Sequence, residues 1–170
     1  MIKVTGCILI ILSCSLIGWM KGNSYKERTK ELENIIEMIK LMELYITYRK
    51  EPLIKAFDKV STTKKCWFSN VLKDCKYYMD KKLELDDSLK KAIDDHIGST
   101  PLNEEDILVL EDLTMGLGKS DSESQRRILE PILIRLNNNQ NSARYRESSM
   151  GKMYKTLGIA IGIVISILII

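Results

Sequence analysis

Long apolar runs occupy both ends of the chain, whereas charged and apolar positions are mixed between them. The first run extends from Val4 to Met20, and the second, from Met153 to Ile170, contains one charged residue, Lys155. At about 1.5 Å per helical residue, the runs would cover ~25 Å and ~27 Å of a hydrocarbon core that is ~30 Å thick. The pattern predicts a transmembrane anchor in residues 1–21 and a second one in residues 153–170, with the Lys155 side chain reaching toward the headgroups.

The first run has two alternative interpretations as a removable signal. Lys3 supplies a minimal basic start and Ser13-Cys14-Ser15 a weak cleavage site, while Ile11-Leu12-Ser13-Cys14 faintly resembles a lipobox. Leu16 to Met20 continues the apolar run past any such cut, and a cleaved signal normally ends there. This length favours an uncleaved anchor.

Basic residues gather where each apolar run meets the middle of the chain. They are Lys21, Lys26, Arg28 and Lys30 after the first run and Arg144, Arg146, Lys152 and Lys155 at the second. Flanks rich in Lys and Arg stay on the cytoplasmic side of a membrane. Both anchors therefore predict that the domain between them, residues 22–152, faces the cytoplasm.

The middle segment has the apolar spacing of helices and predicts an all-α fold, a compact antiparallel bundle of about six helices. The clearest helix runs from Tyr25 to about Arg49. Its apolar residues recur every three or four positions. They form two adjacent stripes that we expect to be buried: Leu32, Ile35, Ile39, Met42 and Ile46, and beside them Met38, Leu41, Tyr45 and Tyr48.

Prolines and polar caps predict the next three helices. A short helix begins near Pro52 and runs through Val60, and a third carries apolar residues from Phe68 to Met79. Asp86-Asp87-Ser88 offers N-caps for a fourth helix, in which Ile97 should point inward and Gly98 should end the helix.

Two more helices complete the predicted bundle. Asn103, with Asp106 three residues later, caps a fifth helix that should bury Ile107, Leu110, Leu113 and Leu117 and end at Gly116 and Gly118. Ser120-Asp121 caps the last helix, which contains Pro131 and the run Asn137 to Ser142. That run could be solvated helix or a flexible joint; the helix-compatible stretch from Arg144 to Lys155 favours helix.

Charge and composition exclude several classes of function. All 23 acidic residues, and every Lys or Arg except Lys3, lie between Lys21 and Lys155, where the two signs nearly balance. A nucleic-acid surface would need a clustered basic excess. Cys66 and Cys75 lack metal-ligand spacing, His96 is the only histidine, and Gly118-Lys119-Ser120 lacks the first glycine of a phosphate loop. We therefore expect no catalytic residue, cofactor, metal or nucleic-acid partner.

Glycines at both apolar runs are a stronger signal. Gly18 and Gly22 are four residues apart, and so are Gly158 and Gly162. Such pairs allow helix backbones to approach closely in lipid, although the spacing is also common by chance. They are candidates for membrane helix packing, against another helix or against each other.

Three segments together resemble the stage III sporulation protein AB family. Ile46-Thr47-Tyr48 followed by Pro52-Leu53-Ile54-Lys55-Ala56-Phe57 is similar to its I-x-Y…P-L-x-x-A pattern. Leu117-Gly118-Lys119-Ser120-Asp121-Ser122-Glu123-Ser124-Gln125 is similar to L-G-x-S-D-x-x-x-Q, and Met153-Tyr154…Leu157-Gly158 enters the final apolar run as in the family. Each motif is weak alone, and their order makes the resemblance specific over essentially the whole chain. The departures are Pro131 and the Asn-rich run.

The resemblance implies a helical domain similar to the cytoplasmic domains of secretion and pilus platform proteins, which have no catalytic activity. It implies a scaffold in the mother-cell membrane around the forespore, at the channel between the two cells. The expected partners are a stage III sporulation protein AA-like ATPase and other membrane proteins of the channel, and self-association is left open.

The turn from Leu117 to Gln125 is the candidate partner interface, with Leu117, Gly118, Ser120, Asp121 and Gln125 as its residues. A helix stop followed by an N-cap explains the same residues at least as well. Two other functions compete with the scaffold. One is an external, membrane-flanked sensor domain, which predicts a signalling region after the second anchor; the other is an enzyme with an unrecognised membrane-proximal site.

Overall fold

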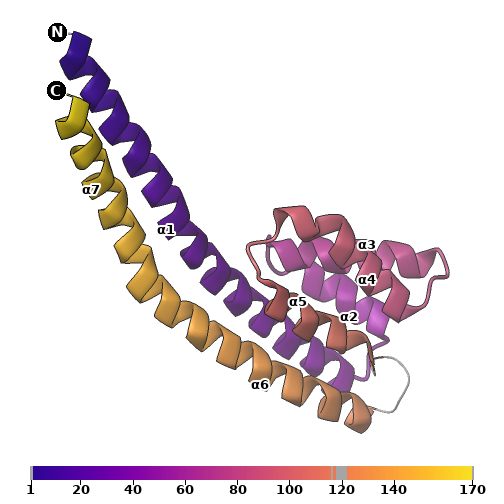
Figure 1. The fold of residues 1–170 in the computed structure, drawn as a ribbon. Coiled ribbons are helices and arrows are strands. Elements are labelled where there is room, and N and C mark those ends of the chain that lie inside the picture. Colours follow the sequence, from indigo (N-terminus) through magenta and orange to yellow (C-terminus); the bar gives the residue numbers. More distant parts are fainter. Residues whose placement is uncertain (1, 116, 118–121, 170) are drawn as a thin grey trace. The chain divides into compact units, whose positions relative to one another are not determined.

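The computed structural model describes residues 2–115, 117 and 122–169, and over these residues the chain forms helices and no strand (Figure 1). The α-helices are α1 (Ile2–Glu43), α2 (Leu53–Ser61), α3 (Trp67–Asp80), α4 (Leu85–His96), α5 (Glu104–Glu111), α6 (Ser122–Arg146) and α7 (Lys152–Ile169). Short π-helical turns follow α1 (Leu44–Tyr48) and α6 (Glu147–Gly151), and 3-10 turns follow α4 (Ile97–Ser99) and α5 (Asp112–Met115). The predicted all-α fold is confirmed.

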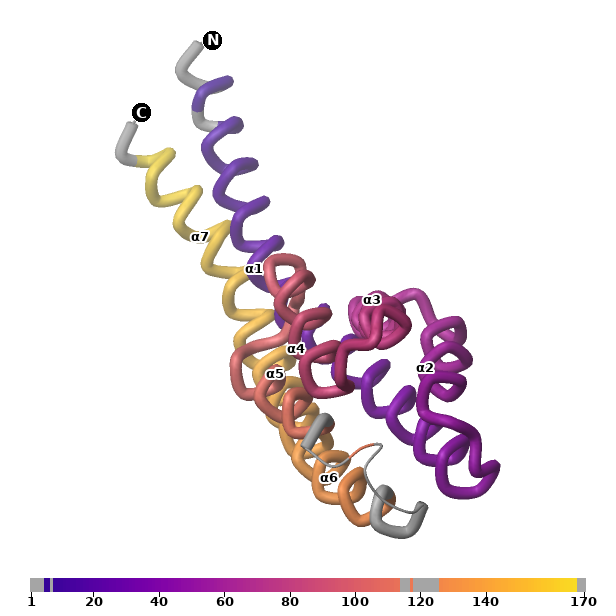
Figure 2. The backbone as a smooth tube through the Cα atoms, turned by 90° about the vertical axis from the view of Figure 1, so that its right-hand side faces the viewer, coloured from indigo at the N-terminus to yellow at the C-terminus, as the bar shows by residue number. Residues whose placement is uncertain are grey.

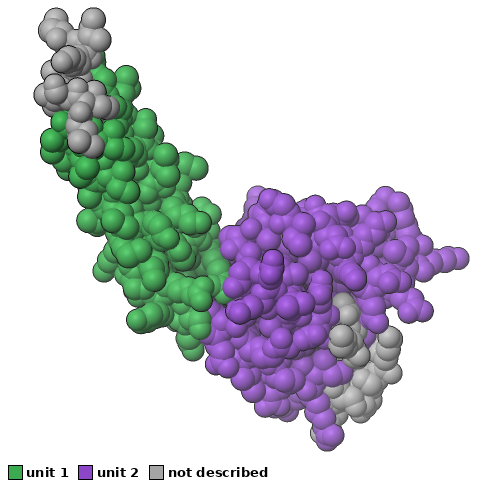
Figure 3. Space-filling model, viewed as in Figure 1, with its two compact units in different colours: residues 1–29, 141–170 green, residues 30–140 purple. Residues whose placement is uncertain are grey.

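The chain divides into two compact units (Figure 3). The first, called the helix pair below, comprises residues 1–29 and 141–170, and the second, called the bundle, comprises residues 30–140. The long helices α1 and α6 each contribute to both units. The predicted domain boundaries, after residues 21 and 152, stay predictions.

The bundle is built around one apolar core to which every one of its helices contributes. Its largest fully buried side chains are Leu32, Ile35, Met38, Ile39, Met42, Phe57, Phe68, Leu72, Leu89, Ile93, Leu110 and Leu113. Helix α3 packs against α2 on one side and α4 on the other, and α4 in turn contacts α5 (Figure 2). The first predicted stripe of α1 is therefore confirmed as core, and so is the apolar face of α5.

The second predicted stripe of α1 is only partly correct. Met38 is buried and Leu41 and Tyr45 are half-buried, but Tyr48 is 69% exposed. The last turn of this helix, Leu44–Tyr48, is a π-helix, which holds an extra residue per turn and rotates the side chains that follow. Tyr48 therefore leaves the buried face.

The ends of α4 also differ from the prediction. The N-cap is Glu84, so Asp86 and Asp87 lie in the first turn. Their negative charges stabilise the helix there by interacting with the positive end of its dipole. At the other end Ile97 is 52% exposed and not inward. The α-helix stops at His96 and a 3-10 turn begins, so the 3.6-residue spacing that would bury Ile97 is lost.

Helix α6 continues through Pro131 and through the Asn-rich run. Pro131 is exposed, whereas Leu129, Ile132 and Leu136 are buried on the other side of the helix. The predicted helix is thus confirmed, and the alternative, a flexible joint at residues 137–142, is excluded. Its predicted N-cap, Ser120-Asp121, lies outside the described residues, as do Gly116 and Gly118 at the end of the preceding helix.

In the helix pair, the first part of α1 and α7 lie side by side and antiparallel (Figures 1 and 2). Many of their apolar side chains are exposed, among them Leu9, Leu12, Leu16, Ile17, Ile159, Ile161, Val164 and Ile167. Judged by length and apolar composition, the described part of the chain holds one helical stretch able to cross a membrane, Arg126–Ile167. This stretch includes the predicted C-terminal anchor, and both flanking membrane helices stay predictions.

Candidate functional site

The helix pair is held at glycines that leave no room for a side chain. A Cβ on Gly18 would lie 2.6 Å from the carbonyl oxygen of Tyr154 and 3.0 Å from the Cα of Gly158. A Cβ on Gly158 would lie 2.7 Å from the carbonyl oxygen of Cys14. Backbone therefore contacts backbone between α1 and α7, the arrangement that small residues allow between membrane helices.

The other two glycines proposed for helix packing lie on either side of this contact. A Cβ on Gly22 would lie 2.8 Å from the carbonyl oxygen of Gly151 and 3.0 Å from the aliphatic stem of Lys155. A Cβ on Gly162 would lie 3.0 Å from the Cα of Ile11. In the structure, Gly18 and Gly22 of α1 thus pack against α7, and Gly158 and Gly162 of α7 pack against α1.

Aromatic and basic side chains lie around the helix pair close to Gly18 and Gly22. The rings of Tyr25 and Tyr154 stack with centroids 6.0 Å apart and planes 19° apart. Trp19 is 55% exposed, and the stem of Lys155 lies over Gly22. We call Trp19, Lys21, Tyr25, Tyr154 and Lys155 the basic–aromatic collar.

Two shallow grooves run along the helix pair from the collar. One has a volume of about 370 Å³ and is lined by Cys14, Ile17, Gly18, Lys21, Tyr154, Leu157, Gly158 and Ile161. The other has a volume of about 430 Å³ and is lined by Leu12, Ser15, Leu16, Trp19, Lys155 and Ile159. Each groove is almost wholly apolar and contains one lysine.

The predicted partner interface is only partly described by the structure. Leu117 is 2% exposed, so its side chain belongs to the core of the bundle. Gly118, Ser120 and Asp121 lie outside the described residues. Gln125 is in the first part of α6. The interface and the helix-stop interpretation of this turn therefore both stay open.

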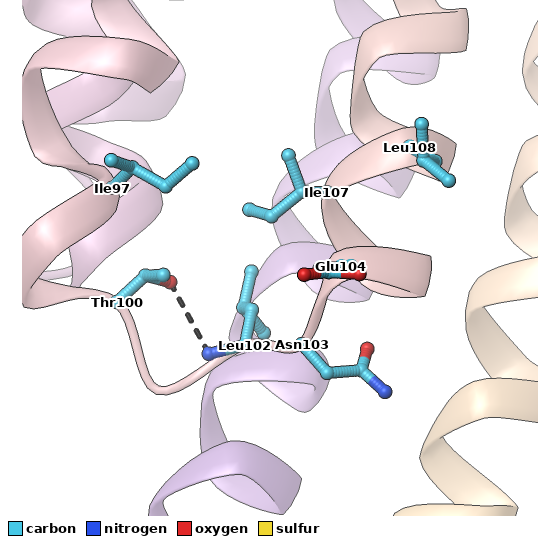
Figure 4. Close-up of a pocket in the computed structure, with 7 residues that line it drawn as sticks. All are labelled: Ile97, Thr100, Leu102, Asn103, Glu104, Ile107 and Leu108. Atoms are coloured by element: carbon cyan, nitrogen blue, oxygen red, sulfur yellow. Dashed lines mark hydrogen bonds between the residues drawn. The ribbon is translucent and has the colours of Figure 1, made fainter.

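The bundle carries a surface groove at the connection between α4 and α5 (Figure 4). Ile97, at the end of α4, faces Ile107 of α5 across it, and Leu108 is 56% exposed beside it. The Oγ1 of Thr100 accepts a hydrogen bond from the backbone N–H of Leu102 at 3.3 Å, and Glu104 lies at the rim. The groove offers apolar contact and one carboxylate. It has no nucleophile paired with a base.

A buried carboxylate joins α5 to the Asn-rich run of α6. Asp106 is fully buried; its Oδ2 accepts the backbone N–H of Asn103, whose Oδ1 accepts the N–H of Asp106 in return. The capping box predicted at Asn103 is thereby confirmed. The Nδ2 of Asn139 donates to Asp106 Oδ1 at 2.8 Å. This partner was not predicted, because no sequence signal links positions 33 residues apart.

Two pairs of titratable side chains connect α3 and α4. The Nε2 of His96 lies 2.7 Å from Asp74 Oδ2, and the hydroxyl of Tyr78 donates to Asp95 at 2.6 Å, which raises the pKa of Tyr78 to about 12. Burial raises the pKa of Cys75 to about 12. In the stretches with described side chains, no three His, Cys, Asp or Glu residues come together as a metal site. None of these shifts activates a nucleophile or base near neutral pH.

The chain is similar to known proteins in both sequence and fold. A relative from Bacillus subtilis (strain 168), "Stage III sporulation protein AB", is 24% identical over 174 residues, and the alignment covers 99% of each of the two chains. A solved structure of the same name superposes with a TM-score of 0.67 at 18% identity, over 72% of this chain and 98% of that one, which shows the shared fold. The model of the stage III sporulation protein AB family matches residues 3–170. The chain therefore belongs to the stage III sporulation protein AB family, and its role is in sporulation.

Proposed function

We propose that this protein is a membrane-anchored platform of the sporulation apparatus. The helix pair crosses the mother-cell membrane around the forespore, and the bundle stands on the cytoplasmic side. There it couples a stage III sporulation protein AA-like ATPase to the membrane proteins of the channel between the two cells. The proposal has no catalytic step, and the bundle acts through its surface.

The basic–aromatic collar is the observation that carries the membrane part of this proposal. Trp and Tyr collect at the boundary between lipid and water, and Lys stems extend along a helix to bring their charge out of lipid. Beyond the collar, toward Ile2 and Ile169, the exposed side chains of the described residues are mainly apolar. On the other side of it stand Lys26, Arg146 and Lys152, which favours the cytoplasm for that side.

The chemistry of the bundle supports a scaffold over an enzyme. Its titratable pairs stabilise the fold, and its surface carries an apolar groove next to the exposed carboxylates Glu104 and Glu105 of α5. Such surfaces suit protein contacts, in which a few apolar anchors lie within a polar rim. The turn from Leu117 to Gln125 remains our proposed contact for the ATPase.

Reporter insertion tests the orientation. The connection between α3 and α4 is exposed, and Lys82 there adopts φ of 69°, so an insertion after Lys82 interrupts no helix. A fluorescent protein that folds only in the cytoplasm should be active at this position, and alkaline phosphatase, which needs the outside, should be inactive. The opposite result would contradict the platform and favour the sensor interpretation.

Asp121→Ala tests the ATPase contact. Loss of sporulation and of co-purified ATPase, with an unchanged circular dichroism melting curve, is the expected result. A lower melting temperature with the ATPase still bound would identify Asp121 as a helix cap only. Glu130→Ala, on the exposed side of α6, is the matched control and should change neither property.

A further inference from the structure

We propose that each of the two grooves of the helix pair binds an anionic phospholipid, with an acyl chain along the apolar walls. The phosphate would lie at Lys21 in the first groove and at Lys155 in the second. This proposal rests on the membrane placement proposed above. It goes further by assigning a ligand class to a surface that would otherwise be in contact with bulk lipid.

The shape of the grooves follows from the glycines. Because Gly18 and Gly158 allow the backbones to touch, larger side chains on either side stand above the contact and form walls. In the first groove the walls are Ile17 and Ile161, which are 67% and 52% exposed. From Tyr154 to Ile161 the helix rises ~10 Å, enough to hold the upper part of an acyl chain.

The charge at the end of each groove selects the headgroup. Lys21 and Lys155 are exposed, and neither has an ion-pair partner among the described residues. The basic side chains of the helix pair at and beyond the collar are Lys21, Lys26, Arg28, Arg144, Arg146, Lys152 and Lys155. Only Glu27 and Glu147 oppose them, and Glu27 Oε1 accepts the side-chain amide of Asn23. Basic residues between and beside membrane helices attract anionic headgroups.

A lipid explains this arrangement better than a third helix would. An apolar helix would fill the walls but would leave both lysines without a counter-charge at the membrane surface. A phosphate diester with acyl chains matches both parts of each groove. The same combination occurs on both sides of the pair, since Trp19 and Ile159 line the second groove together with Lys155.

Lipid retention by the full chain tests whether Lys21 and Lys155 bind the anionic headgroup. Protein reconstituted in nanodiscs of equal phosphatidylglycerol and phosphatidylcholine is extracted with mild detergent, and native mass spectrometry identifies the lipids that remain bound. We expect phosphatidylglycerol to be retained in excess and the double variant Lys21→Gln, Lys155→Gln to lose most of it, at least fivefold. Lys90→Gln, an exposed lysine of α4, is the control and should retain lipid as the wild type does.

A second pair of variants tests the acyl contact. Ile161→Trp fills the first groove and should lower retention, whereas Ile163→Trp, at a residue that is 46% exposed and lines neither groove, should not. Glycerol 3-phosphate in millimolar excess should displace no lipid, because the headgroup alone lacks the acyl contact. Displacement of the lipid by glycerol 3-phosphate would show that the site binds phosphate alone and would overturn the proposal.

The two proposals fail in different ways. Equal retention of both lipids, or retention unchanged in the double lysine variant, overturns the lipid site. Release of the wild-type chain from cell membranes by alkaline carbonate overturns the membrane anchor itself. A chain that resists carbonate but has no preference for phosphatidylglycerol therefore contradicts only this inference.

Discussion

Asn139 gives the Asn-rich run a structural role. Its side chain reaches from α6 to Asp106, a fully buried carboxylate at the start of α5. A buried carboxylate is costly unless its oxygens accept hydrogen bonds. The Asn-rich run, which departs from the family pattern, thus contains a residue that connects α6 to α5 by a hydrogen bond.

We expect Asn139→Ala to destabilise the bundle by about 1–3 kcal/mol, because it removes a donor from a buried charged acceptor. Asn138→Ala, at the exposed neighbour, should change stability by less than about 0.5 kcal/mol. Urea unfolding of the full chain in detergent, followed by the fluorescence of the buried Trp67 in a Trp19→Phe background, measures both. Equal stability of the two variants would contradict this role of Asn139.

Cys75 should be chemically silent in the folded protein. Burial raises its pKa from 9.0 to about 12, so the folded state favours the neutral thiol. The stability that this gives is complete below pH 9 and is lost as the pH rises toward 12. At pH 8.5 the thiolate fraction is lower than that of an ordinary thiol on the order of 10³-fold.

Iodoacetamide labelling at pH 8.5, read by mass spectrometry of peptides, checks this expectation. Cys75 should be labelled only as fast as the bundle unfolds, and in urea it should react like any free thiol. Cys66, whose pKa is also raised by burial, is only half-buried and should react first. Labelling of Cys75 before Cys66 under native conditions would show that the core opens locally there.

Among elements, α1 is the one for which local pattern and tertiary structure differ most. The sequence divides it into an apolar run and an amphipathic helix from Tyr25, yet it is one helix from Ile2 to Glu43. The apolar spacing from Leu32 to Ile46 predicts its core side correctly, since packing in the bundle follows the 3.6-residue period. Its π-helical end could not be predicted, because the one-residue phase shift has no residue signature.

The antiparallel register of α1 and α7 predicts a disulfide. A Cβ on Gly162 would lie 3.3 Å from the Cβ of Cys14, close to the 3.5–4.5 Å of disulfides. A Cβ on Gly162 would also lie 3.0 Å from the Cα of Ile11, so the helices must part slightly, which brings the two Cβ atoms into the disulfide range. In a background of Cys7→Ser, Cys66→Ser and Cys75→Ala, Gly162→Cys should therefore form an intramolecular bond with Cys14 upon mild oxidation. Gly6→Cys is the control, because a Cβ there has no neighbour within 4 Å among the described residues.

Mass spectrometry of the oxidised chain distinguishes the outcomes. A linked peptide pair within a monomer supports the register. Dimers joined through the same cysteines would instead mean that the contact forms between copies of the chain, and an absence of any bond would contradict the pairing of these helices.

At the scale of the whole molecule, the bundle has a core of its own. The largest fully buried side chains of the described residues come from residues 30–140, and five of them belong to α1: Leu32, Ile35, Met38, Ile39 and Met42. We therefore expect residues 30–140, expressed alone, to be a soluble monomer that unfolds cooperatively.

Residues 44–140 provide the matched control. This fragment lacks the α1 part of the core and should be helical without a cooperative transition, since the remaining helices cannot bury their apolar sides. Circular dichroism and calorimetry compare the two fragments. A fragment 30–140 that aggregates or melts gradually would show that the bundle depends on the helix pair.

The sequence by itself determined what depends on local spacing. Apolar residues every three or four positions predict the helices and most of the core, and Asn103 with Asp106 predicts a cap that the structure confirms. The order of three motifs identifies the family. These features depend on residues a few positions apart, so they can be read along the chain.

Only the tertiary structure decided which distant residues meet. It brings Gly18 to Gly158 and Asn139 to Asp106, and it turns Ile97 outward into a groove. Many positions of a helix have similar local chemistry, and the packing of whole helices selects one register among them. The grooves beside the glycines, with Lys21 and Lys155 at their ends, arise from that register.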